Sequence, residues 1–192
     1  MTDAYAELIA EVSAGRFGAP APGQWSAEQI AAHVARNHEA LIEVSEAVLR
    51  GDQVCYDNRE VTRDRVLDAY VTAHGGLAGL GDRLAVTVTA LRELVAALAE
   101  TGMTAVPVRI QDGADVVVHQ PMPWIKVLEI DRDEHVPRHL AQLRALRPAE
   151  AGPADAPPAA PPPPVAAPAP PTTTAPPTQP ATKRPTAPDR VG

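Results

Sequence analysis

Cysteine is almost absent from this chain of 192 residues, because Cys55 is the only one. A single cysteine excludes a disulfide within the chain. Basic residues are in deficit as well: the net charge is −7, whereas a protein that binds nucleic acid usually carries a basic patch. Long hydrophobic runs are also missing, since no stretch of about 18 apolar residues is present to span a membrane.

The N-terminus, MTDAYAELIAEV, is acidic and amphipathic, and it does not have the basic start and apolar centre of a signal peptide. We therefore expect a soluble cytoplasmic protein. Its partners are expected to be small molecules rather than nucleic acid or a membrane.

Proline divides the chain into two parts. Of the 22 prolines, 16 lie at or beyond Pro148, in a segment that is mostly Pro, Ala and Thr. Such a segment has too few large apolar residues to offset the entropy lost on ordering. We therefore predict a disordered, partly polyproline-like tail at residues 148–192 and a single domain at residues 1–147, which is long enough to bury a core.

Three helical regions are expected before about residue 101. The first is expected at about 3–14. The second starts after Ser26, which forms a capping box with Gln29, and its apolar residues recur at helical spacing to about residue 50. The third, at about 62–101, is expected to bend or break at its glycines. Leucines recur there every seven residues, at Leu77, Leu84, Leu91 and Leu98. This seam is typical of core packing, and it could also bury against a second subunit, which makes a homodimer possible.

A β-hairpin is expected before the last helix. The stretch VPVRIQDGADVVVH holds two β-rich runs around Asp112-Gly113, a strong hairpin signal. A final helix then runs from about Trp124 to Leu146. Four main helices and one hairpin predict an all-α four-helix bundle with a small β-hairpin before the last helix and a disordered C-terminal tail.

Two histidines of the last helix, in the stretch DRDEHVPRHLAQLRAL, lie where its apolar residues should be. At about 100° per residue, His135 and Leu143 each fall roughly 40° from His139, on opposite sides. On the second helix, His33 lies about 60° from Ile30, at the edge of that helix's apolar face. Three histidines from two helices thus point toward one core.

These histidines permit two interpretations. Each ring could be a hydrogen-bonded core residue, because burial of a polar ring without a partner is unfavourable. Alternatively, rings at positions i and i+4 can share one metal ion, and a third ring from a facing helix completes the set. Neutral imidazole suits Zn²⁺, Ni²⁺ or Fe²⁺, and three protein ligands leave one position open, as in catalytic sites. The ligands would be His33, His135 and His139.

Two polar residues near these histidines have candidate supporting roles. Asp131, four residues before His135, could accept a hydrogen bond from its second ring nitrogen, or it could belong to a solvated acidic patch. Asn37 lies well inside the apolar face of the second helix, where it is either a bonded core residue or a partner for His33. His38 lies at the flank of that helix and is expected to be half-exposed.

Three further residues are candidates for lining a pocket near the site. His119 ends the hairpin and could lie at the pocket mouth. Tyr56 and Asn58 come from a polar loop that could close over the bundle or form an ordinary turn, the interpretation that we favour. Pro137 separates the two histidines of the last helix and removes one amide donor, so it either kinks that helix or marks its start near Val136.

Two stretches together, WSAEQIAAHVARNHEAL and DEHVPRHLAQLRAL, resemble the DinB-like superfamily, and within it the N-terminal domain of mycothiol-dependent maleylpyruvate isomerase. The shared pattern is a Trp-led helix start followed by a His, and an H-x-x-x-H followed by a Gln-Leu pair on the last helix. The matching residues are Trp25, His33, His135, His139, Gln142 and Leu143. The resemblance covers about residues 3–147.

The resemblance implies a four-helix bundle with a divalent metal held by three histidines or by a mixture of His and Glu. Carried over by position, the ligands are His33, His135 and His139. It also implies a metal-dependent thiol S-transferase or isomerase that uses a low-molecular-weight thiol such as mycothiol or bacillithiol. The alternative function is a non-catalytic metal-binding or protein-interaction module with the Pro-rich tail as its working end.

Overall fold

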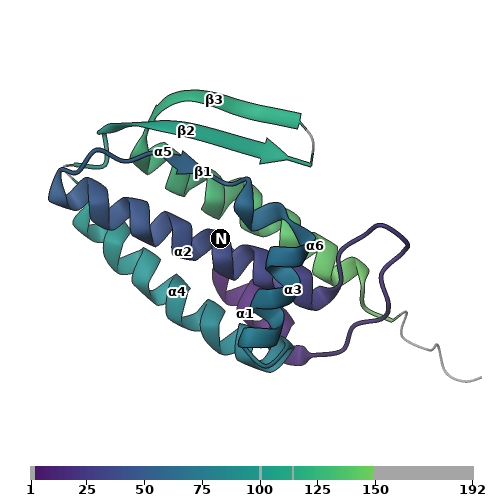
Figure 1. Ribbon diagram of the computed structural model, residues 1–192. Coiled ribbons are helices and arrows are strands. Elements are labelled where there is room, and N and C mark those ends of the chain that lie inside the picture. The colour runs from purple at the N-terminus through teal and green to yellow at the C-terminus, as the bar shows by residue number, and fades with distance from the viewer. Residues whose placement is uncertain (1–2, 100, 114, 149–192) are drawn as a thin grey trace, which may run out of the picture. The chain divides into compact units, whose positions relative to one another are not determined.

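The computed structural model describes residues 3–99, 101–113 and 115–148. The predicted tail lies outside these residues apart from Pro148, so the domain boundary at residue 147 stays a prediction. The described part is mainly helical and carries a small three-stranded sheet (Figure 1). No helix in this part of the chain combines the length and the apolar character needed to cross a membrane.

The first two helices begin and end close to where the sequence predicts. Helix α1 spans Ala4–Ala14, and α2 spans Ala27–Arg50. The predicted capping box is present: the Gln29 backbone N–H donates to Ser26 Oγ at 3.2 Å, and the Ser26 N–H donates to Gln29 Oε1 at 3.0 Å. These bonds satisfy donors that a helix start otherwise leaves unpaired, and they fix the first turn of the helix that carries His33.

The third helical region is broken at its glycines, as predicted. A short 3₁₀ helix, η1 (Glu60–Thr62), leads into α3 (Asp64–Ala73), and α4 (Leu77–Ala97) follows. Between them Gly75 and Gly76 have φ angles of 73° and 78°, a region that side chains with a Cβ rarely adopt. Three of the four seam leucines (Leu84, Leu91 and Leu98) are buried within the chain. The seam is therefore core packing, and the homodimer stays a prediction.

The sheet contains the predicted hairpin and one strand that the sequence analysis missed. Strand β2 (Ala105–Asp112) pairs antiparallel with β3 (Asp115–Pro123), which confirms the hairpin. Strand β1 (Tyr56–Asp57) pairs parallel with β2, so the prediction of an ordinary turn there was wrong. The reason is a side chain that extends the pairing: Asn58 Nδ2 donates to the Gln111 carbonyl at 2.9 Å, and Asn58 Oδ1 accepts from the Gln111 N–H at 2.7 Å. The mainly helical fold is as predicted, and the small β element is a three-stranded sheet rather than a hairpin alone.

The last helix is continuous but changes its winding in the middle. It consists of α5 (Trp124–Ile130), a π-helical turn η2 (Asp131–His135) and α6 (Val136–Ala145). The Val136 N–H donates to the Asp131 carbonyl, five residues back, which is the π-helical pattern. This wider turn accommodates Pro137, which has no N–H to donate. The helix therefore neither starts at Val136 nor breaks there.

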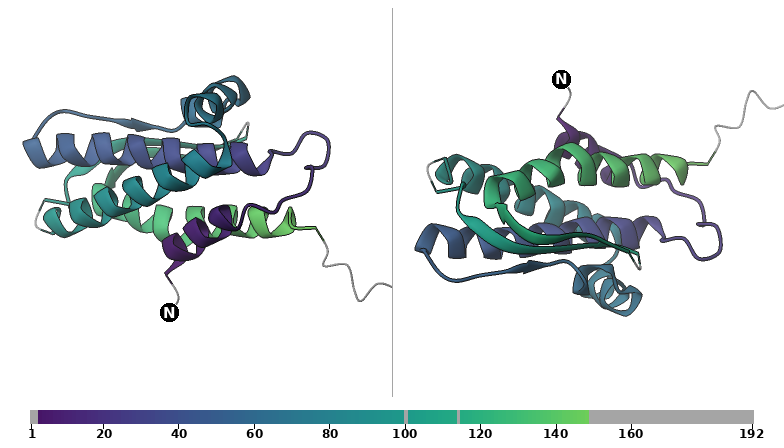
Figure 2. Two further views of the ribbon diagram at one scale, coloured as in Figure 1. Left: turned by 90° about the horizontal axis from the view of Figure 1, so that it is seen from below. Right: turned by 90° about the horizontal axis from the view of Figure 1, so that it is seen from above.

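Helix α2 is the centre of the packing. It contacts α3, α4 and α6, whereas α1 contacts α4 and α6. Figure 2 shows α2 and α4 running side by side and α1 lying beside α6. The sheet lies along α2 and α5 and packs Val106 and Val108 against them (Figure 1).

The apolar core is divided into two clusters. One joins α1, α3, α4 and α6 to the first half of α2, and the other joins the sheet, α5 and the far end of α4 to the second half of α2. On α2 the buried polar residues Asn37 and His38 fall between the two clusters. Polar side chains therefore interrupt the core where the helices meet.

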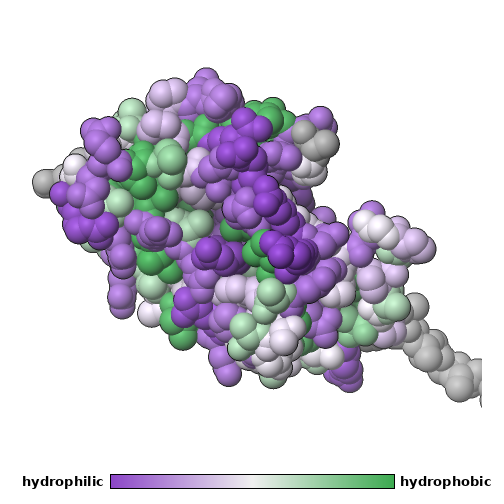
Figure 3. All heavy atoms as spheres, in the orientation of Figure 1, coloured by the Kyte–Doolittle hydropathy of each residue, from purple (hydrophilic) through white to green (hydrophobic). Residues whose placement is uncertain are grey.

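One face of the molecule is mainly hydrophilic. Hydrophilic residues cover most of the face shown in Figure 3, and hydrophobic residues emerge between them as separate patches. The large apolar side chains that are most exposed in the described part, Met103, Val117 and Val86, belong to three different segments.

A carboxylate bridge ties α2 to α3 and α4. Glu39 accepts hydrogen bonds from Tyr70 Oη at 2.7 Å, from Arg83 Nε at 2.8 Å and from Arg36 Nη1 at 3.0 Å. Partial burial acts to raise the pKa of Glu39, but the bonds from Tyr70 and Arg83 outweigh it, so the pKa lies below its ordinary value. The bridge therefore stabilises the fold in the ionised state.

Replacement of Glu39 by glutamine is expected to lower the free energy of unfolding by about 1 kcal/mol at pH 7. Because the pKa of Glu39 is depressed in the folded state, its contribution is full above the unfolded pKa of about 4.5 and is lost as the pH falls through the folded value. Urea unfolding of both proteins at pH 7 and pH 3.5 checks this. An equal difference at the two pH values would contradict it.

Candidate metal centre

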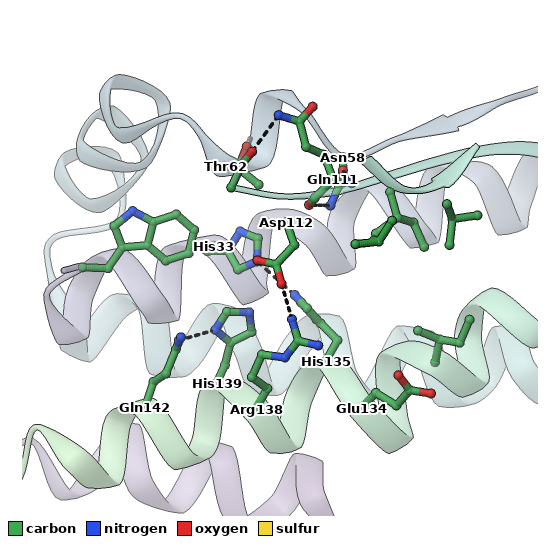
Figure 4. A pocket seen from close by; sticks show the side chains of 16 residues that line it. His33, Asn58, Thr62, Gln111, Asp112, Glu134, His135, Arg138, His139 and Gln142 are labelled. Atoms are coloured by element: carbon green, nitrogen blue, oxygen red, sulfur yellow. Dashed lines mark hydrogen bonds and ion pairs between the residues drawn. The ribbon is translucent and has the colours of Figure 1, made fainter. Parts of the chain in front are cut away.

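Three histidines from two helices meet beneath the hairpin. His33 comes from α2, His135 ends the π-helical turn, and His139 comes from α6 (Figure 4). Each histidine offers one ring nitrogen, and these three nitrogens all lie within 4.8 Å of one another. Nε2 of His33 lies 2.9 Å from Nε2 of His135. The structure thus brings together the three residues that the sequence analysis selected as ligands.

The outer nitrogen of each ring is anchored. Nδ1 of His33 lies 2.7 Å from the Val61 carbonyl oxygen, and Nδ1 of His135 lies 2.8 Å from Asp131 Oδ1. Nδ1 of His139 lies 2.8 Å from Oε1 of Gln142, one turn further along α6. All three partners can only accept, so each Nδ1 carries a hydrogen and donates it. In a neutral ring, Nε2 then holds a free lone pair, the arrangement typical of metal-binding histidines.

The short distance between two Nε2 atoms needs an explanation. Two unprotonated nitrogens at 2.9 Å would face each other with their lone pairs, so a positive charge has to lie between them. It is either an extra proton on one ring or a shared cation. Nitrogen ligands about 2.1 Å from one ion lie roughly 3.0 Å apart at a right angle and about 3.4 Å apart at the tetrahedral angle. The observed separation is therefore compatible with a shared metal ion.

Burial keeps two of the rings neutral. It lowers the pKa of His33 to about 3, helped by the neighbouring His135. It lowers the pKa of His139 to about 2, helped by His33 and His135. Metal ligation requires the neutral imidazole, so both rings are in the binding form at neutral pH without loss of a proton.

Asp131 is a buried carboxylate that binds the outer ring nitrogen of His135, on the side away from the other two histidines. Besides His135, it accepts hydrogen bonds from Tyr5 Oη at 2.9 Å and from Asn37 Nδ2 at 3.0 Å. Nε2 of His38 lies 3.3 Å from Oδ2 of Asp131, the oxygen that also accepts from Tyr5. Burial acts to raise the pKa of Asp131, but His38 and His135 outweigh it and hold the pKa well below its usual range. A solvated acidic patch is excluded for Asp131, because its side chain is only 3% exposed.

Asn37 acts on the site through Asp131 rather than through His33. Its Nδ2 donates to Asp131, and its Oδ1 accepts from Tyr56 Oη at 2.5 Å. Tyr56 is buried and lines a small cavity of about 50 Å³ next to Asn37 and Asp131. The structure therefore places Tyr56 behind the histidines, where it holds Asn37 in position.

His38 is fully buried, so the prediction of a half-exposed ring was wrong. A projection of α2 alone puts it at the flank, but neighbouring helices cover that flank. The ring of Tyr5 from α1 packs edge-on against it at 5.5 Å between centroids. Its Nδ1 lies 3.3 Å from Thr87 Oγ1 on α4. His38 therefore belongs to the support of Asp131 and not to the group of three histidines.

A pocket of about 380 Å³ opens beside the three histidines. Trp25 forms one wall, with its ring centroid 4.9 Å from that of His33. The hairpin roofs the pocket with Ile110 and Val118. The volume lies within the usual range for small-molecule sites, and the lining mixes apolar side chains with many polar and charged ones.

Two residues that were predicted to line a pocket differ in their placement. Asn58 lies in the lining of the pocket beside the histidines. His119 is exposed on β3 opposite Arg109 and is not part of that lining. Successive side chains of a strand point to opposite faces, and the neighbouring Val118 takes the face toward the pocket. His119 consequently points the other way.

The sequence analysis missed several pocket residues. Glu134 and Arg138 precede the two histidines of the last helix by one residue each, and both reach the pocket together with Asp112 from the hairpin turn (Figure 4). Because Glu134 and Arg138 are the sequence neighbours of His135 and His139, the sequence could have suggested that they lie near the site. The position of Asp112 depends on how the hairpin folds over the helices, which no local pattern reveals.

Comparisons with known proteins do not extend this description. No protein-family model matches the chain, and neither the curated proteins nor the solved structures contain a match. The chemistry of the site therefore has to be inferred from its own geometry.

Proposed function

We propose that the protein binds one divalent metal ion through His33, His135 and His139, with Zn²⁺, Ni²⁺ or Fe²⁺ as the candidates. The observation that carries this proposal is that one ring nitrogen from each of the three histidines lies within 4.8 Å of those of the other two, while Nδ1 of each ring faces an acceptor. Separate core histidines have no need to bring three ring nitrogens within 4.8 Å of one another. The donor set fits a borderline metal, since it is made of imidazole alone.

We further propose membership of the DinB-like superfamily. The four helices of the bundle would be α1, α2, α4 and the composite helix α5–η2–α6. The contacts of α2 with α4 and α6, and of α1 with the same two helices, support this arrangement. The resemblance of the Trp25 and histidine motifs to that superfamily points the same way.

The pocket determines what such a centre could do. A bound divalent metal would lower the pKa of a thiol and present it as thiolate, which is the chemistry of a thiol S-transferase or isomerase. Trp25, Ile110 and Val118 give the pocket apolar surface beside the histidines. Asp131 holds the ring of His135 in one orientation. The cosubstrate would be a low-molecular-weight thiol such as mycothiol or bacillithiol.

Loading the protein with Co²⁺ tests this function, because a cobalt–thiolate bond gives a charge-transfer band in the near ultraviolet. Titration of the Co²⁺ protein with mycothiol or bacillithiol is expected to produce this band, with release of about one proton per thiol bound. Thiol binding is expected to disappear when the metal is removed. A fully metallated protein that shows no band with any thiol would rule out thiol chemistry and would leave the alternative, a non-catalytic metal-binding module.

A further inference from the structure

Arg138 stands out among the pocket residues by its charge. Among the described residues that line the pocket, it is the only lysine or arginine. It directly precedes His139 on α6, and Figure 4 shows its guanidinium pointing from that helix toward Asp112. The pocket thus combines a candidate metal centre with one fixed positive charge.

The guanidinium of Arg138 already forms an ion pair with a carboxylate of the chain, that of Asp112. Nη1 of Arg138 donates to Oδ2 of Asp112 at 2.8 Å, across from α6 to the end of β2. The two side chains are 55% and 65% exposed, so this ion pair contributes little stability and can be exchanged. Asp112 engages one guanidinium nitrogen, whereas a guanidinium can offer a free carboxylate two parallel hydrogen bonds.

We infer that the ligand of this pocket is a small thiol that carries a carboxylate, and that Arg138 binds this carboxylate in place of Asp112. The inference rests on the proposed thiol chemistry and restricts it to thiols that carry a carboxylate, which bacillithiol has on its malyl group and mycothiol lacks. The sulfur would lie toward the three histidines, and the carbon skeleton would lie against Ile110 and Val118. Because Asp112 and Glu134 in the same lining repel an anion, the carboxylate of the ligand depends on Arg138 as its partner.

A pair of matched thiols tests the inference on the Co²⁺-loaded full-length protein. The probes are 3-mercaptopropionate and 3-mercapto-1-propanol, which differ in the carboxylate, and the near-ultraviolet cobalt–thiolate band reports binding of both. Arg138→Gln is expected to weaken the binding of 3-mercaptopropionate about tenfold or more and to leave that of 3-mercapto-1-propanol within about twofold. Asp112→Asn is expected to tighten 3-mercaptopropionate several-fold, because it removes the competing carboxylate.

Arg132→Gln is the matched control, since Arg132 lies on the same composite helix outside the lining of this pocket. It should change neither affinity. If Arg138→Gln affects both thiols equally, or neither, the carboxylate site is overturned while the thiol chemistry stands. If the metallated protein gives no band with either thiol, the thiol chemistry and the carboxylate site are overturned together.

Discussion

Replacement of Asp131 by asparagine is expected to lower the free energy of unfolding by about 2–4 kcal/mol and the affinity for the metal by about 10–100-fold. The buried carboxylate accepts hydrogen bonds from Tyr5 and Asn37. It also contacts the ring nitrogens of His38 and His135. An amide of the same shape has one acceptor oxygen, so its NH₂ group must face one of these donors. The loss therefore combines an unsatisfied polar group with the loss of the charge that orients His135.

Asp133→Asn is the matched control for this variant. Asp133 lies two residues further along the same π-helical turn, but it is exposed and pairs with Arg132 on the surface. Its replacement should change stability by less than about 0.5 kcal/mol and should leave metal affinity unchanged. Urea unfolding and metal titration of both variants provide the comparison. If the two variants behaved alike, Asp131 would have no special role behind the site.

Replacement of His139 by alanine is expected to reduce metal affinity by about 100-fold or more, because two histidines remain and the facial set is lost. In the unsubstituted protein, metal at a hundredfold excess over its Kd should stabilise the fold by about 2.7 kcal/mol, which a rise in melting temperature reports. The variant should show no such rise. His119→Ala is the control, because His119 is exposed on β3 outside the pocket. A metal-dependent rise that survives in His139→Ala would place the ion elsewhere.

Much of the fold follows from local patterns in the sequence. The capping box of Ser26 and Gln29 and the Asp112-Gly113 turn each act within a few residues, so they can be recognised without knowledge of the rest. Strand β1 could not be recognised in this way. It is only two residues long, and its partner, β2, lies about 50 residues further along the chain. The π-helical turn was missed for a similar reason: the sequence suggested that Pro137 causes a kink or marks a helix start, whereas a wider turn also accommodates it.

The candidate site shows the same division between local and distant information. Helical spacing was sufficient to select His33, His135 and His139, because the faces of two helices can be projected from the sequence. The partners of these rings were less accessible. Asp131 lies one turn before His135 and was found, whereas the Val61 carbonyl comes from a different segment than His33 and was not. His38 was misplaced because the helices that cover it cannot be seen from α2 alone.

The central claim, that three histidines hold one metal ion, is tested most directly by anomalous diffraction from crystals of the protein loaded with one equivalent of Zn²⁺. Data collected on both sides of the zinc absorption edge locate the ion without reference to any assumed ligand. We expect one anomalous peak per chain at about 2.0–2.1 Å from Nε2 of His33, His135 and His139, with an open side toward the pocket below Ile110 and Val118. A fully loaded crystal whose zinc peak lies away from these three nitrogens would contradict the assignment.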